Sequence, residues 1–155
     1  MLSLELRRPV RARPSASAGY RRTLVPVSDG PGGELAVDLA CRFAGDKHAV
    51  LVALAPIEIP LEMPLDVPAR EEEARAHMLL ERALAIGASY GVRVVPRTVR
   101  TRSAADAILE EASRARAEIV VLGVSRGPRL GSTIEFVLKH APCRVMLASS
   151  PPPAE

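Results

Sequence analysis

Cysteine, aromatic residues and long apolar runs are all scarce in this chain of 155 residues. The 2 cysteines, Cys41 and Cys143, form no CxxC pair, so neither a disulfide framework nor a zinc site is predicted, and buried thiols in a reducing compartment are expected. No stretch reaches the roughly 18 apolar residues that a membrane helix needs, and no apolar leader segment follows the first charges. We therefore expect a cytoplasmic protein with no membrane span.

Nucleic-acid binding is also disfavoured by composition. With 2 Phe, 2 Tyr and no Trp, the chain has no aromatic platform on which bases could stack. The net charge of +3 comes from residues 1–22, which hold six arginines and one acid, whereas residues 23–155 hold 15 basic and 17 acidic side chains. We predict that 1–22 is a disordered basic arm, that 23–149 is the folded domain and that the proline-rich segment 150–155 is a disordered tail.

Several catalytic and metal-binding signatures are missing from the sequence. The chain contains no Walker lysine motif, no GxSxG and no GxGxxG, which disfavours P-loop, common hydrolase and dinucleotide-binding functions. His48, His77 and His140 are dispersed and pair with no second ligand at metal-site spacing. No metal site is predicted.

What the sequence does contain is an alternation of short apolar runs and amphipathic segments, which is typical of β-α units around a parallel sheet. Of the five runs, 92–99 contains a proline and alternating arginines, and 144–148 is short. Both features favour positions at the edges of the sheet. The predicted strands are 23–28, 49–55, 92–99, 118–124 and 144–148, with the third and fifth at the edges. Apolar residues at helical spacing predict four intervening helices, the third capped by Ser103 with Asp106 and the fourth running from about Ser132 to Pro142.

Right-handed crossovers favour a single doubly wound five-stranded α/β sheet with strand order 3-2-1-4-5 and helices on both faces. In this order the chain leaves the first and fourth strands in opposite directions, which opens a crevice at their carboxyl ends. The crevice is predicted between Val27, Ser28 and Asp29 on one side and Leu122, Gly123 and Val124 on the other. A small-molecule ligand is expected there.

The most informative segment is 120–147, where a strand, a glycine-containing loop, Gly131-Ser132-Thr133 and a helix follow one another. Backbone amides of such a loop, the helix dipole and the two hydroxyls could bind a phosphate group. The alternative is that Gly123, Gly127 and Gly131 serve only a tight turn and that Ser132 only caps the helix.

Here the sequence resembles the universal stress protein family over about 22–149, with the closest match in GSTIEFVLKHAPCRVML and a further one in LVPVSDGPGGELAVDLA. The segment IEIPLEMPLDVP is similar to the corresponding part of family domains associated with amino-acid permeases. The resemblance implies the adenine-nucleotide alpha-hydrolase-like fold. It also implies either an ATP-binding sensor or a nucleotide-free dimeric module.

Residues of the ATP-binding branch are only partly present. The pattern implied by the resemblance is glycine, two residues, glycine, nine residues and then Gly-Ser or Gly-Thr, and Gly123 and Gly131-Ser132 match its ends. Arg126 occupies the second glycine position and only four residues separate it from Gly131, so the loop is five residues short. The acidic residue expected at the end of the first strand falls on Ser28, one position before Asp29. Pro56, at the position implied to read the adenine edge, has no N–H.

These departures predict weak or no ATP binding, although Arg126 and Arg129 could contact an anionic ligand directly. The primary hypothesis is a non-enzymatic regulatory or stress-response domain with no certain cofactor. An ATP or adenine-nucleotide sensor using the same crevice, and a small hydrolase dependent on Ser132, are the alternatives. The resemblance further implies a homodimer formed through the edge strand, including Arg144, Val145, Met146 and Leu147, and allows a membrane transporter as a regulatory partner.

Overall fold

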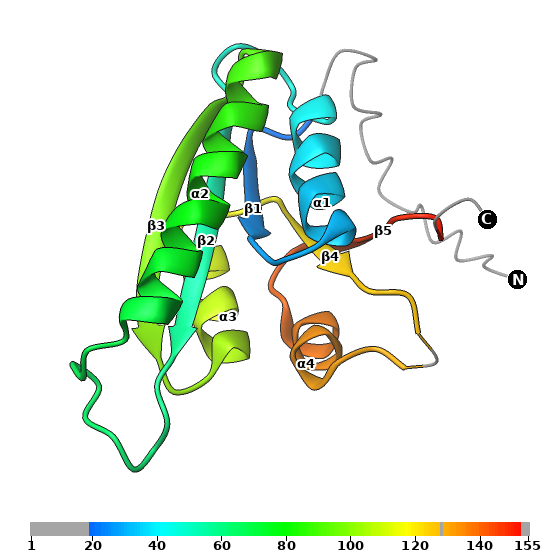
Figure 1. Ribbon diagram of the computed structural model, residues 1–155. Coiled ribbons are helices and arrows are strands. Elements are labelled where there is room, and N and C mark those ends of the chain that lie inside the picture. The colour runs from blue at the N-terminus through cyan, green and yellow to red at the C-terminus, as the bar shows by residue number, and fades with distance from the viewer. Residues whose placement is uncertain (1–18, 128, 153–155) are drawn as a thin grey trace, which may run out of the picture.

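The computed structural model describes residues 19–127 and 129–152, which form one open α/β sheet with helices on both faces (Figure 1). The elements in chain order are β1 (Arg22–Pro26), α1 (Pro31–Arg42), β2 (Val50–Glu58), α2 (Arg70–Tyr90), β3 (Arg93–Thr101), α3 (Ala104–Arg114), β4 (Ile119–Val124), α4 (Ser132–His140) and β5 (Arg144–Ser149). All neighbouring strands pair in parallel, and their order is β3-β2-β1-β4-β5. The predicted fold class and strand order are confirmed.

Successive side chains of the central strands point to opposite faces of the sheet, so the core forms two layers. Val25 and Val121 face α1 and α2, whereas their neighbours Leu24 and Val120 face α3 and α4. Each of these four side chains is buried, as expected for strands covered on both faces. The edge positions predicted for the third and fifth strands are confirmed by β3 and β5.

The first two strands differ from prediction at their ends. β1 ends at Pro26 rather than Ser28, although the Val27 amide still donates to the Leu54 carbonyl at 2.8 Å. β2 continues to Glu58, three residues beyond its predicted end, because β3 pairs with it as far as Thr101. Beyond Leu54, therefore, β2 has β3 on one edge and open space past the end of β1 on the other.

The predicted arm and tail lie mostly outside the described residues, namely 1–18 and 153–155. The described part of the arm joins the folded body: Tyr20 bridges Ala44, and Arg22 is the first residue of β1. Residues 150–152 follow β5 without regular secondary structure. Within the described ranges, no helix combines the length and apolar character that a bilayer crossing requires.

Candidate functional site

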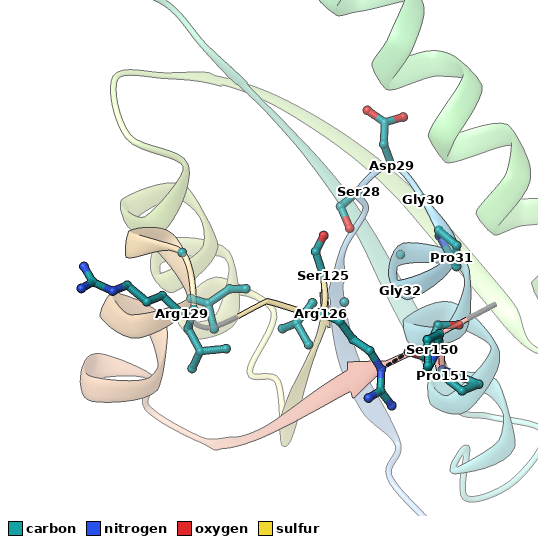
Figure 2. A pocket seen from close by; sticks show the side chains of 17 residues that line it. Ser28, Asp29, Gly30, Pro31, Gly32, Ser125, Arg126, Arg129, Ser150 and Pro151 are labelled. Atoms are coloured by element: carbon teal, nitrogen blue, oxygen red, sulfur yellow. Dashed lines mark hydrogen bonds between the residues drawn. The ribbon is translucent and has the colours of Figure 1, made fainter. Parts of the chain in front are cut away.

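A cavity of about 580 Å³ opens at the carboxyl ends of β1 and β4. This is the point where the chain departs in opposite directions from two adjacent parallel strands, which is where open α/β sheets bind small ligands. Three segments line it, as Figure 2 shows: the β1–α1 loop, the end of β4 with the following loop, and the residues after β5. This cavity is called the crevice below, and its position agrees with the predicted one.

At the crevice, the backbone at the start of α1 lies very close to β4 and to the β1–α1 loop. A Cβ added to Gly123 would lie 2.5 Å from the Gly32 carbonyl oxygen, and one added to Gly33 would lie 2.0 Å from the Ser28 carbonyl oxygen. Glycine is therefore required at both positions by packing. The closeness brings the first turn of α1 to the crevice wall.

Gly131 has a different role from Gly123. Its φ of −67° suits any residue, and a Cβ added there meets nothing within 4 Å. It is the N-cap of α4 and lines the crevice. The position thus leaves open space beside the start of a helix. Gly127 is similarly open but is not among the lining residues.

Two helix N-termini meet at the crevice, since Gly30 to Gly33 begin α1 and Gly131 begins α4. The helix dipole makes such ends favourable for anions. At α1 the dipole contributes more than amide donors, because Pro31 has no N–H and the Gly33 N–H donates to the Gly30 carbonyl oxygen at 3.1 Å. Arg126 and Arg129 also line the cavity. The electrostatic character of the site therefore favours a negatively charged group.

Hydroxyl groups face one another across the crevice. In Figure 2 the Ser28 and Ser125 side chains point toward each other from the β1 and β4 sides. Ile134 and Leu130 add apolar area. The cavity can accordingly accept a ligand with an anionic group, hydrogen-bonding groups and an apolar part.

Asp29 lines the crevice mouth, but its carboxylate points away from Ser28 and Arg126 in Figure 2. Its Oδ2 lies 3.8 Å from Arg75 Nε of α2, and both side chains are exposed. In Figure 2 the Arg129 side chain extends away from Arg126. Neither side chain is aimed at the centre of the cavity.

The remaining predicted site residues fall in other places. Val27 and Pro56 line a second cavity of about 220 Å³ against α2, and Ser132 and Thr133 line a third of about 320 Å³ with Ser103 and Asp106. Leu122 is 4 % exposed and belongs to the core layer under α3 and α4. The crevice therefore gathers Ser28, Asp29, Gly123, Arg126, Arg129 and Gly131 from the predicted set.

The missing N–H of Pro56 lies at the open edge of β2. Backbone polar groups alternate between the two edges of a strand, and the Leu54 carbonyl faces β1. The Pro56 nitrogen faces the same edge two residues further on, past the end of β1. A ligand extending from the crevice toward β2 would find no amide donor from this residue.

Sequence reasoning missed Ser125, Pro31 and the segment after β5 as crevice residues. The register pairs Val124 with Ser149, so residues after Ser149 leave the sheet beside the end of β4. That placement was available from the strand order. The proline-rich end itself carries no binding motif that would indicate it.

Neither cysteine lines the crevice. Burial raises the pKa of Cys41 to about 11, with the Asp38 charge adding to the rise, and burial also raises the pKa of Cys143. Both are free thiols; Cys41 is buried, as predicted, whereas Cys143 is only partly buried. Across residues 19–127 and 129–152, no three His, Cys, Asp or Glu side chains gather in a metal-binding group.

The fold and crevice define a doubly wound α/β domain with a cavity at the carboxyl ends of β1 and β4, where the chain direction reverses. The family model for the universal stress protein family matches residues 19–149, and the chain belongs to that family. A search of curated proteins finds no match.

Solved structures share the fold. A universal stress protein from Archaeoglobus fulgidus in complex with dAMP is 16 % identical, with a TM-score of 0.67, over 82 % of this chain and 95 % of the other. A family member from Burkholderia pseudomallei is 24 % identical, with a TM-score of 0.66, over 88 % and 100 %. A family protein from Arabidopsis thaliana with AMP bound is 20 % identical, with a TM-score of 0.59, over 84 % and 92 %.

Proposed function

We propose that this domain is a non-enzymatic regulatory module whose crevice reversibly binds an adenine nucleotide with few phosphates, and binds ATP weakly or not at all. The observation that carries the proposal is the convergence of the α1 and α4 N-termini with Arg126 on one cavity of about 580 Å³. Helix ends and a guanidinium favour an anionic group, and the cavity has apolar walls for a base. The dAMP and AMP complexes of the two structural neighbours support this ligand class.

The short loop is the reason to expect a nucleotide with fewer phosphates. Arg126 replaces the second glycine of the family pattern, and only four residues lie between it and Gly131. A loop of this length offers fewer amides to a triphosphate. The absent Pro56 donor removes one further bond, and each buried acceptor left unpaired costs about 1–3 kcal/mol.

Isothermal titration calorimetry with AMP and ATP tests the proposal. We expect AMP to bind at least as tightly as ATP, with a Kd for ATP of about 100 µM or weaker, equivalent to about −5.5 kcal/mol. A low-micromolar Kd for ATP would instead favour the ATP-sensor alternative, which the two crevice arginines support. If neither AMP nor ATP binds, nucleotide recognition by this domain is refuted.

Two glycine variants locate the ligand. Gly131→Leu places a side chain in open space beside the crevice, whereas Gly127→Leu occupies open space that does not line it. We expect the first to lose AMP binding and the second to retain it, with thermal melts showing that both fold. Equal loss in both would place the ligand elsewhere.

Binding without turnover is the proposed mode of action. The hydrolase alternative depends on Ser132, which lines the third cavity and not the crevice. Nucleotide and ester substrates should therefore remain intact on incubation with the protein. Turnover that disappears in a Ser132→Ala variant would reverse this part of the proposal.

The proposed module is a cytoplasmic homodimer formed through β5. This strand is the sheet edge next to β4, with Val145 and Met146 half-buried and Leu147 exposed. An apolar edge strand favours pairing with a second copy. Arg144, the fourth predicted interface residue, donates to the Tyr20 hydroxyl at 3.3 Å within the same chain. A transporter remains the proposed regulatory partner, on the resemblance of the segment 57–68 alone.

A further inference from the structure

The chain returns to the crevice after its last strand. β5 ends at Ser149, which is in register with Val124 at the end of β4. Ser150, Pro151 and Pro152 then line the crevice, which Pro31 at the start of α1 also lines (Figure 2). These three residues are called the strap.

A hydrogen bond holds the strap against the loop that follows the neighbouring strand β4. Arg126 Nε donates to the Ser150 carbonyl oxygen at 2.6 Å, joining the β4–α4 loop to the residues after β5. In Figure 2 the guanidinium is turned toward Ser150 and away from the Ser28 and Ser125 hydroxyls. A phosphate held near those hydroxyls could be reached by Arg126 only after this bond is released.

The backbone of the strap has few accessible conformations, so a single hydrogen bond can order it. Pro151 and Pro152 have a fixed φ, and Ser150 is restricted because a proline follows it. Fewer conformations are therefore lost when the strap is ordered than in a flexible segment. The acceptor is a backbone carbonyl, so no substitution of the Ser150 side chain removes the bond.

We propose that the strap is autoinhibitory: by engaging Arg126 it restrains the crevice, and nucleotide binding and strap release are coupled. The inference rests on the proposed function, because it concerns the affinity of the same site. Coupling is reciprocal, so a bound nucleotide must loosen the strap by the factor by which the strap weakens nucleotide binding. A partner that captured the strap would thereby raise nucleotide affinity.

The first test needs no ligand. Amide NMR relaxation of Ser150 is compared in the full chain, in Arg126→Gln and in Arg129→Gln. We expect greater Ser150 mobility in Arg126→Gln only. Arg126 donates the hydrogen bond to Ser150, whereas Arg129 lines the same crevice and serves as the matched control. Unchanged Ser150 mobility in Arg126→Gln overturns the strap, whether or not a nucleotide binds.

The second test measures AMP affinity by calorimetry. Deletion of residues 150–155 should tighten AMP binding about tenfold, which corresponds to about 1.4 kcal/mol and is the size of a hydrogen bond to a charged group. Deletion of 153–155 alone keeps the Ser150 carbonyl and should change nothing. In the Arg126→Gln background the longer deletion should give no gain, because the restrained side chain is already absent.

The outcomes separate the two proposals. If AMP binds equally well with and without 150–155, or more weakly without them, autoinhibition is wrong while nucleotide binding stands. If neither chain binds AMP, the proposed function and the inhibitory role both fall, and Ser150 relaxation still decides whether the strap bond exists. A tenfold gain confined to chains with Arg126 supports the inference.

Discussion

At the scale of single residues, the most constrained charge in the described structure is Glu111 on α3. It is 3 % exposed, and Arg114 donates to it through Nε at 3.0 Å while Arg97 Nε of β3 lies 3.3 Å from its Oε1. The hydrogen bond from Arg114 lowers the pKa of Glu111 despite burial, which raises it, and the Arg97 charge adds to the lowering. The group links α3 to the sheet edge and is structural.

Glu111→Gln should therefore destabilise the fold by about 2 kcal/mol at pH 7, because it leaves two arginines without their carboxylate. A carboxyl with a lowered folded pKa stabilises above its unfolded pKa, and that contribution is lost as pH falls through the folded pKa. The difference in unfolding free energy between wild type and variant should therefore narrow as the pH falls below 4.5, the ordinary pKa of a glutamate side chain. Urea unfolding across pH measures it, with the exposed neighbour Glu110→Gln as control. Equal stability of Glu111→Gln and wild type at pH 7 contradicts this account.

At the scale of elements, the β2–α2 loop is hydrogen-bonded to two arginines, Arg100 near the end of β3 and Arg102 just after it. Arg102 Nη1 donates to the carbonyl oxygens of Ile59 at 3.2 Å and Met63 at 2.8 Å, and Arg100 Nη1 donates to that of Val67 at 2.6 Å. The loop presents Leu61, which is 83 % exposed. In Figure 1 this loop projects beyond the ends of β2 and β3. Two arginines thus order a segment that has no regular secondary structure of its own.

Arg102→Ala should release this loop while costing only about 1 kcal/mol of global stability, since the lost bonds lie near the surface. Hydrogen exchange should accelerate at the amides of residues 61–63 and 65 and stay unchanged in the central strands. Arg93→Ala, an exposed change at the other end of β3, is the matched control. Slow exchange of the same loop amides in Arg102→Ala would show that the loop is ordered by other contacts.

Elements and crevice were predictable to different degrees. Buried runs such as 118–124 and Ser103 as an N-cap follow from local pattern, and the Ser103 hydroxyl does accept from the Asp106 amide at 3.3 Å. The position of the crevice follows from strand order. The direction of Asp29 could not be predicted, because it depends on an ion pair with Arg75, which lies 46 positions later on another element.

At the scale of the whole molecule, the unpaired β5 edge predicts the assembly. Leu147→Glu places two equal charges near each other across the proposed two-fold axis and should raise the dimer dissociation constant at least about tenfold. Leu84→Glu on α2 is the control, because Leu84 and Leu147 are both 37 % exposed. Light scattering after gel filtration distinguishes one chain from two. A wild-type monomer at micromolar concentration, or a dimer unaffected by Leu147→Glu, contradicts β5 pairing.

The central claim, that the switch-point crevice receives a nucleotide, is tested most directly by a crystal structure determined with AMP. We predict difference density for the phosphate beside Ser28 and Ser125, near the start of α4, together with a displaced Arg126 side chain. Density for AMP at another surface, or an empty crevice at saturating AMP, would contradict the account.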